Sequence, residues 1–155
     1  MGMKRSGKSA DDMVDEWVDG FVNAAIQAMG KLGVECVNHA RQIPKDIGFE
    51  DHTGNLRSSI GFKLFVNGEP VMENYRKVLN GNEGMAKGKA LADEVGQRCQ
   101  QDQIMLVVTA GMEYAIYVES RGRDVIASAE SLCYENLPQL RTRIEEMVRN
   151  AVRRQ

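Results

Sequence analysis

The chain has 155 residues, of which 22 are acidic and 20 are basic, and it contains three cysteines. A chain of this length forms one ordinary domain that buries about two-thirds of its unfolded surface, so it needs no metal or disulfide for stability. The near balance of charge argues against a protein whose main task is to coat nucleic-acid phosphates or an anionic membrane surface.

The cysteines and the first ten residues indicate the compartment and the domain boundary. Cys36, Cys99 and Cys133 lie far apart, and an odd number without paired spacing is typical of a reducing compartment, so we expect three buried thiols. Residues 1–10 are polar and lack the apolar core of a signal peptide, and no later apolar run has the length that spans a membrane. We therefore expect a flexible tail at 1–10 and a single domain at 11–155.

The first predicted element is a long helix that ends at Pro44. Ser9 is a suitable N-cap, and acidic residues crowd the first turns, where the helix dipole favours negative charge. Apolar residues then recur at steps of three and four for some thirty residues, which predicts an amphipathic helix on the order of 45 Å long. A compact domain of this size needs no such length, so we expect part of the helix to contact a neighbouring subunit.

A turn, a strand and an insert follow this helix. Residues 53–55 tolerate a tight turn, and imperfect alternation over 56–66 predicts a strand whose even-numbered residues are buried. Asn67-Gly68 then predicts a two-residue hairpin turn. Residues 70–103 are interpreted as an insert. Its expected parts are a short helix at 72–79, a loop at 80–84 and a weak helix at 86–101.

The C-terminal third adds one strand and more helix. The nearly continuous apolar run at 104–111 predicts a central strand that is covered on both faces and is the best-buried strand of the sheet. Residues 114–118 fit a short helix at least as well as another strand, and we favour the helix; residues 125–126 fit a short edge strand. A final helical region is expected to be divided at Pro138, with Asn136 capping its second part. Together these elements predict an α+β domain in which a long N-terminal helix and a C-terminal helix pack on a small antiparallel sheet.

Patterns that would support metal binding, phosphate binding or nucleophilic catalysis are incomplete. Cys36 and His39 are one helical turn apart, but no second pair exists to complete a tetrahedral site. Residues 84–90 resemble a phosphate-binding loop, yet the spacing is one residue short. Ser58 and Ser59 lack the Gly-x-Ser-x-Gly setting of an exposed nucleophile. The residues therefore predict no catalytic, cofactor-binding or metal-binding site.

Two short segments separated by the insert carry the most specific signal. The first is Thr53-Gly54-Asn55-Leu56-Arg57-Ser58-Ser59-Ile60, and the second is Tyr114-Ala115-Ile116-Tyr117-Val118-Glu119 followed by Gly122. In this order and between two amphipathic helices, they resemble the bacteriophage head-tail joining and tail-completion proteins, which include minor tail and head-tail connector proteins. The positions that match the family motifs are Thr53, Gly54, Asn55, Leu56, Arg57, Ser59, Ile60, Tyr114, Ala115, Tyr117, Val118, Glu119 and Gly122. The chain departs from the family pattern in its longer insert and in Asp51, which stands one position further from the Thr-Gly pair.

The resemblance implies a structural protein of virion morphogenesis at the phage head-tail junction or tail end, without an enzymatic step or a cofactor. It implies a ring of identical subunits, six in number by analogy with the family, that contacts connector or portal-side proteins and tail-tube proteins. It also implies a phage or prophage origin, assembly in the cytoplasm of a bacterial host and a final location in the virion. Neither a membrane nor a specific nucleic acid is an expected partner.

Two other functions remain open from the residues. A small-ligand enzyme or binding protein would use a pocket beside Tyr114, Tyr117 and Glu119, with Glu113 and Glu119 as a carboxylate pair. A DNA-associated accessory protein would use the basic C-terminal end, which contains Arg149, Arg153 and Arg154. Under the assembly hypothesis, Glu119 is expected to anchor the turn at 53–55 or to contact another subunit. The working surfaces are then expected to be the long first helix and the insert.

Overall fold

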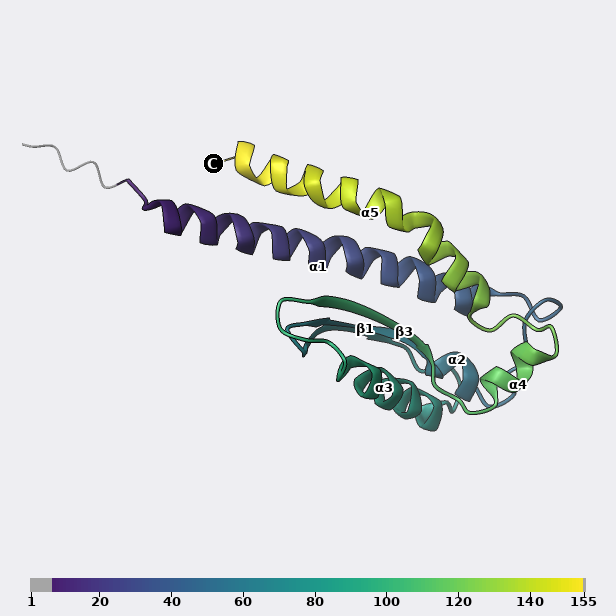
Figure 1. Ribbon diagram of the computed structural model, residues 1–155. Helices are drawn as coiled ribbons and strands as arrows, with labels where there is room; N and C mark the ends of the chain where they lie inside the picture. Colours follow the sequence, from purple (N-terminus) through teal and green to yellow (C-terminus); the bar gives the residue numbers. More distant parts are fainter. Residues whose placement is uncertain (1–6, 155) are drawn as a thin grey trace, which may run out of the picture.

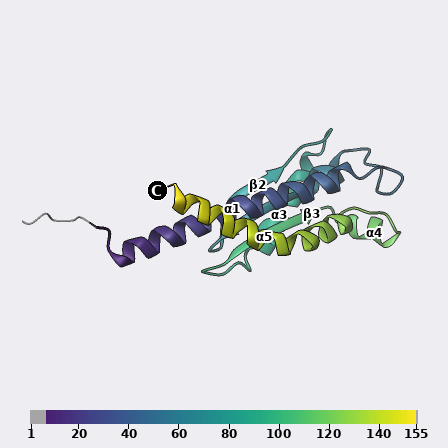
Figure 2. The same ribbon diagram turned by 90° about the horizontal axis from the view of Figure 1, so that it is seen from above.

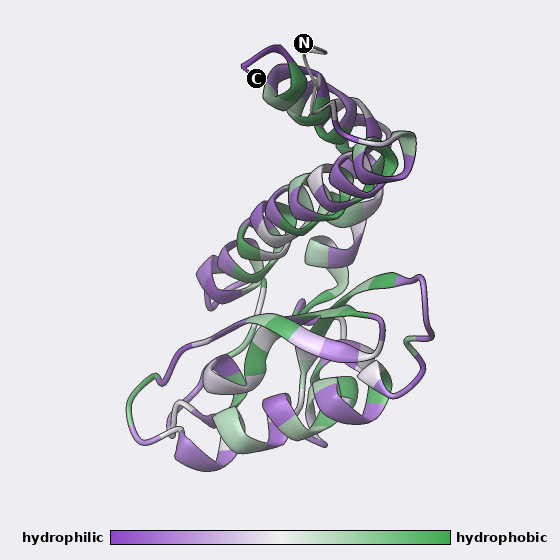
Figure 3. Ribbon diagram, turned by 90° about the vertical axis from the view of Figure 1, so that its left-hand side faces the viewer, coloured by the Kyte–Doolittle hydropathy of each residue, from purple (hydrophilic) through white to green (hydrophobic). Residues whose placement is uncertain are grey.

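The computed structural model describes residues 7–154 and has an α+β fold (Figure 1). In chain order the elements are α1 (Ala10–Gln42), α2 (Asn55–Ser59), β1 (Ile60–Val66), β2 (Glu69–Tyr75), α3 (Asn82–Gly96), β3 (Ile104–Ala110), α4 (Ala115–Ser120) and α5 (Ala127–Arg153). The antiparallel hairpin of α1 and α5 forms one layer, the sheet forms the middle layer, and α3 covers the other face of the sheet (Figure 3). The α+β class with helices at both ends is confirmed.

The long first helix is confirmed and begins as expected. The Ser9 hydroxyl accepts a hydrogen bond from the Asp12 N–H at 3.1 Å, and the Asp12 carboxylate accepts one from the Ser9 N–H at 3.0 Å. This capping box satisfies two backbone donors at the helix start. Of the tail expected at 1–10, residues 1–6 lie outside the described part of the chain, while residues 7–9 are exposed and α1 already starts at Ala10.

The first helix is much longer than the sheet on which it packs. Its 33 residues span about 50 Å. Every residue from 10 to 19 is exposed, and burial begins at Ala24. Viewed from above, the N-terminal part of α1 extends beyond the sheet (Figure 2). Only the C-terminal part of α1 therefore serves the core of its own domain.

The sheet is antiparallel in the order β2-β1-β3, so β1 and not β3 is its central strand. Phe62 of β1 pairs with Asn74 on one side and with Val108 on the other. Residues 60–65 are all buried because α1 covers one face of β1 and α3 covers the other. The prediction for residues 104–111 was therefore wrong, because this apolar run forms a partly exposed edge strand. The even-numbered residues 60, 62 and 64 of β1 are buried as expected, and the odd-numbered residues 61, 63 and 65 are buried as well.

The hairpin turn between β1 and β2 is confirmed, whereas the strand expected from residue 56 begins later. Asn67 and Gly68 have φ angles of 55° and 85°, the left-handed values that a tight two-residue hairpin turn requires. Residues 55–59 form the short helix α2, and the strand starts only at Ile60. The Asp51 carboxylate accepts hydrogen bonds from the Gly54 and Arg57 N–H groups at the start of α2, which favours a helix over an extended chain.

The insert is an integral part of the domain. Residues expected as a short helix at 72–79 instead form most of β2, and the weak helix is the well-formed α3. Glycines let α3 approach the sheet closely: a Cβ at Gly88 would lie 2.3 Å from the Ser59 carbonyl oxygen. The Tyr75 hydroxyl fixes the contact by donating to the Gly88 carbonyl at 3.1 Å. The insert thus supplies one strand and one covering layer.

The C-terminal region differs from its prediction in two places. The short helix expected near 114–118 is confirmed as α4, but no strand forms at 125–126. The last helix, α5, continues through Pro138, although a proline inside a helix removes one backbone hydrogen bond. Asn136 does not cap a new helix, and its side chain donates to the Leu132 carbonyl at 2.7 Å within α5. Figure 1 shows the resulting bend between the two halves of α5.

The hairpin of α1 and α5 has an apolar seam and a covalent link. Small residues of α1 meet branched residues of α5 in a cluster of Ala24, Ala25, Ala28, Ile144 and Val148. Nearer the sheet, Cys36 and Cys133 form a disulfide with their Cα atoms 6.4 Å apart. The expectation of three free thiols was therefore wrong, because the pairing arises from two helices that meet across 97 residues. Cys99 is free and buried, as expected.

Candidate assembly surface

The first motif forms a rigid corner between α1 and the sheet. The two Asp51 carboxylate oxygens accept from the Gly54 N–H at 2.9 Å and the Arg57 N–H at 2.7 Å. Gly54 has φ of 80°, and a Cβ there would lie 2.0 Å from the Val78 carbonyl oxygen, so only glycine fits. Asn55 ties the corner to the insert, because its side-chain oxygen accepts from the Gly84 N–H at 3.1 Å.

Arg57 connects this corner to the end of the long helix. Its guanidinium donates to the carbonyl oxygens of Arg41 and Ile43, the last carbonyls of α1, and lies 4.7 Å from the centre of the Phe49 ring. The Arg41 guanidinium in turn donates to the Ile60 carbonyl at 2.7 Å. Burial lowers the pKa of Arg41 from its usual value. Charged donors at a helix C-terminus also suit the helix dipole, so the motif arginine fixes where α1 ends.

The other first-motif residues are structural as well. Leu56 and Ile60 are buried in the main core, and the Thr53 hydroxyl accepts from the Asn55 N–H at 3.2 Å. Ser59 is fully buried, and its hydroxyl donates to the Leu56 carbonyl at 2.7 Å. These contacts account for the motif through the geometry of the corner.

The second motif holds the start of α5. One Glu119 carboxylate oxygen accepts backbone N–H bonds from Val125, Ile126 and Ala127 at 3.3, 2.7 and 3.0 Å. These donors open α5, which has no side-chain cap at its own N-cap residue. The expected contact between Glu119 and the turn at 53–55 does not occur, because the carboxylate points to the helix start instead. A negative charge at this end is favoured by the helix dipole.

The remaining residues of the second motif divide between core and surface. Ala115 is buried and Val118 packs against the main core, while Gly122 has φ of 78° and closes α4. Tyr114 and Tyr117 are 40% and 55% exposed. Because Glu119 is engaged with backbone donors and both tyrosines face outward, these three side chains do not converge on one enclosed site.

The histidine and serine candidates are also placed by the structure. The His39 ring nitrogen lies 2.8 Å from the Ser128 hydroxyl, on the outer side of the α1–α5 hairpin. Ser58 is fully buried, and its hydroxyl bonds to the backbone of Val78. Among residues 7–154, no group of three or more His, Cys, Asp and Glu side chains is arranged to hold a metal ion.

The largest unexplained feature is the free end of the helical hairpin, which we name the hairpin tip. It consists of exposed apolar side chains of α1 and α5, namely Met13, Val14, Trp17, Val18, Phe21 and Val152. The Trp17 and Phe21 rings stack with their centres 5.9 Å apart, yet Trp17 is 55% exposed. Contiguous exposed apolar surface of this kind marks an interaction site in a soluble protein.

The two helices do not fill the space between them at the tip. A hollow of about 580 Å³ opens between Trp17 and Phe21 of α1 and Val148 and Val152 of α5. A smaller one of about 220 Å³ lies on the other side of Trp17. Both hollows are open to the surface, so the apolar side chains that line them are accessible to another protein.

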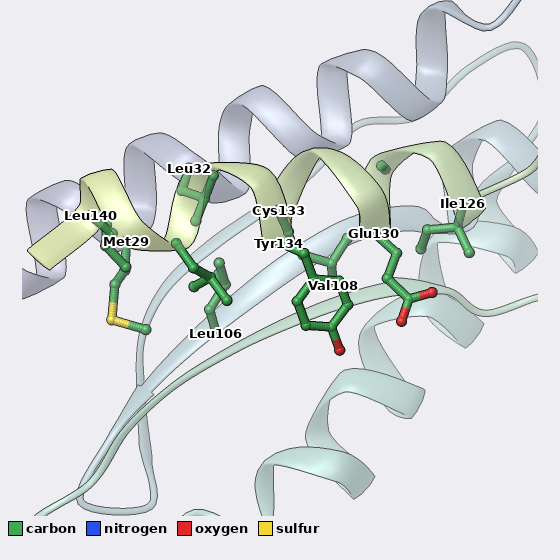
Figure 4. Close-up of a pocket in the computed structure, with 11 residues that line it drawn as sticks. Met29, Leu32, Leu106, Val108, Ile126, Glu130, Cys133, Tyr134 and Leu140 are labelled. Atoms are coloured by element: carbon green, nitrogen blue, oxygen red, sulfur yellow. The ribbon is translucent and has the colours of Figure 1, made fainter.

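A second apolar surface runs from the sheet edge to α5, and we name it the edge groove. It is a hollow of about 540 Å³ between β3, α1 and the first half of α5, and its lining includes Met29, Leu106, Val108, Tyr134, Leu137 and Leu140. In Figure 4, the side chains of Leu106 and Val108 project from the strand, and that of Tyr134 projects from α5 into the same hollow. Tyr134 is 65% exposed. No residue pattern predicts this groove, because it depends on the edge position of β3.

The tip carries opposite charges on its two helices. Residues 10–21 of α1 include five acidic and no basic residues, whereas residues 147–154, which end α5 and include its C-cap, contain three arginines and no acidic residue. The arginines considered for DNA contact therefore share one end of the molecule with an acidic helix. Arg149 and Arg153 line the larger hollow at the tip.

Comparison with protein-family models, curated proteins and solved structures finds no match to this chain. No helix within residues 7–154 combines the length and the apolar character needed to cross a membrane. The candidate site therefore rests on geometry and on the two sequence motifs.

Proposed function

We propose that this protein is a structural component of virion morphogenesis that acts at a phage head-tail junction or tail end by self-assembly and protein-protein contacts. The observation that carries the proposal is the hairpin tip, an apolar surface held away from the domain core and left with unfilled hollows. Covering a projecting apolar surface of this kind with another protein removes it from water and so lowers the free energy. The resemblance of the two motifs to those of tail-completion proteins is what favours a phage head-tail junction or tail end as the place of assembly.

The family resemblance gives the proposal its detail. The chain would form a ring of copies, six by analogy, that joins connector or portal-side proteins to tail-tube proteins. Assembly would take place in the cytoplasm of a bacterial host, and the ring would remain in the virion. A ring contact is heterologous, so it needs two different patches on each subunit. The two helices at the tip, with opposite charge, offer two such patches.

The experiment measures the mass of the purified chain by sedimentation velocity, alone and together with connector and tail-tube proteins. We expect a closed homo-oligomer or a defined complex with one of these partners. Val18→Asp places a charge on the tip and should abolish the complex while leaving the circular dichroism spectrum unchanged. Val71→Asp places the same charge at a similarly exposed valine of β2, outside both apolar surfaces, and serves as the control. A chain that stays monomeric and binds neither partner would overturn the proposal.

A further inference from the structure

We infer that neighbouring copies of this chain pack hairpin against hairpin, with the acidic flank of α1 in one copy against the basic end of α5 in the next copy. This contact rests on the proposed function and extends it, because it names the elements that touch and their relative direction. It commits the hairpin tip to a second copy of the same chain.

The first support is that the opposite charges at the tip are not neutralised within the subunit. Within residues 7–154, no salt bridge joins α1 to α5. The ion pairs nearest the tip are local ones, Lys8 with Glu16 at 2.5 Å and Arg141 with Glu145 at 2.9 Å. A single surface that carries both signs is complementary to another copy of itself, whereas a surface of one sign would repel its own copy.

The second support is the arrangement of these charges around the apolar residues. Asp12, Asp15 and Asp19 follow at steps of three and four, so they share one face of α1. Trp17 and Phe21 lie on a different face, which borders the hollow shared with α5. The acidic flank is therefore free to meet another subunit while the aromatic residues remain beside α5.

On α5, too, charged residues lie beside apolar side chains. Arg149 and Arg153 are one helical turn apart, both are exposed, and both stand at the rim of the larger hollow. Val148 and Val152 are also one turn apart and line the same hollow. A neighbouring helix laid along this edge would cover apolar side chains in the middle and meet arginines at the rim. An interface with an apolar centre and a charged rim is the usual arrangement between proteins.

The charge pattern also selects the direction of packing. A rotation about an axis parallel to the hairpin keeps both tips at one end and allows α1 of one copy to lie against α5 of the next. A two-fold axis across the helices turns the tips in opposite directions and brings like helices together, α1 against α1 or α5 against α5. Like charges in contact strongly disfavour the second arrangement. The selected contact arises in a two-fold pair and equally in a closed ring.

The test uses two full-length variants with reversed charge. The acid-reversed chain carries Asp15→Lys and Asp19→Lys, so the flank of α1 that would meet the neighbouring α5 changes from three negative charges to two positive charges and one negative charge. The base-reversed chain carries Arg149→Glu and Arg153→Glu, so both helices are negative. Each variant alone should self-associate on the order of 100-fold more weakly than the wild-type chain in sedimentation experiments. An equimolar mixture should restore assemblies of wild-type mass that contain both chains. Lys77→Glu, at an exposed position between β2 and α3, is the control and should assemble like the wild type.

The mixture distinguishes a contact between subunits from damage to the fold, because a misfolded variant would not be rescued by its complement. The contact is refuted if either reversed chain assembles like the wild type, or if the mixture stays dissociated while both chains keep the wild-type helix content. If the reversed chains assemble as the wild type does, the proposed function still stands, but the contact between subunits lies on another surface. A wild-type chain that binds connector or tail-tube proteins without self-association would refute this contact alone.

Discussion

The sharpest test of the fold concerns Glu119, which holds the first turn of α5. A single carboxylate oxygen accepts three backbone N–H bonds, and the shortest two are 2.7 and 3.0 Å long. A hydrogen bond to a charged group contributes about 1.5–3 kcal/mol, and a negative charge at a helix N-terminus adds about 0.3–1 kcal/mol. Because Glu119 is only partly buried, water would replace part of this interaction. We therefore expect Glu119→Ala to lower the free energy of unfolding by about 2–3 kcal/mol.

The assay is equilibrium urea unfolding followed by circular dichroism, with the slope of the transition compared between variants. Glu119→Gln keeps an acceptor oxygen but loses its charge, so it should cost about 1 kcal/mol, less than the alanine variant. Glu113→Gln is the matched control: its side chain is 90% exposed and lies 3.8 Å from Lys87. A Glu119→Ala protein as stable as the Glu113→Gln protein would show that the three bonds do not hold α5, and our account of the second motif would then fail.

Four further predictions concern the insert, the first helix and the disulfide. Burial raises the pKa of Tyr75 to about 12. The folded chain therefore keeps a proton that the unfolded chain loses above pH about 10, and urea unfolding at several pH values should show stability falling between pH 10 and 12, less steeply in Tyr75→Phe. Gly88→Ala forces a Cβ to within 2.3 Å of a carbonyl oxygen, so it should cost about 1–3 kcal/mol in the same assay. Gly20→Ala has no atom within 4 Å of the new Cβ and should stabilise the helix by about 0.5–1 kcal/mol. Loss of the 97-residue disulfide loop on reduction should lower the unfolding free energy by about 2–4 kcal/mol, and Cys36→Ser should abolish the difference between reduced and oxidised protein.

The elements that the sequence predicts well are those encoded by contiguous residues. The capped start and the apolar period of α1 extend over more than thirty residues, and Asn67-Gly68 needs only its own φ values to form a hairpin. The short helix α4 was recognisable from the spacing of Tyr114, Ala115, Tyr117 and Val118. In each case the tertiary contacts support the secondary structure that the local sequence favours, so they do not change it.

The failures occur where the partner of a segment is distant in the chain. Residues 72–79 have no strong strand pattern, and 72–75 belong to β2 because the preceding hairpin turn lays them against β1. The apolar run at 104–111 indicated burial on both faces but not the order of the strands, which placed it at the edge. The contact between Cys36 and Cys133 and the bonds of Glu119 to α5 likewise depend on how helices meet. No spacing rule within one segment contains that information.

The geometry connects the two motifs to the assembly surface. Arg57 holds the last carbonyls of α1, and Glu119 holds the first N–H groups of α5, so both motifs act at the base of the same hairpin. The tip lies at the opposite end of α1, about 50 Å away. With that lever arm, a tilt of about 5° at the base would displace the tip by about 4 Å, enough to separate side chains in van der Waals contact. Under the proposed assembly, residues that never touch a neighbouring subunit would therefore control where the hairpin tip meets it. We accordingly expect Glu119→Ala to weaken assembly even under conditions in which the variant remains folded.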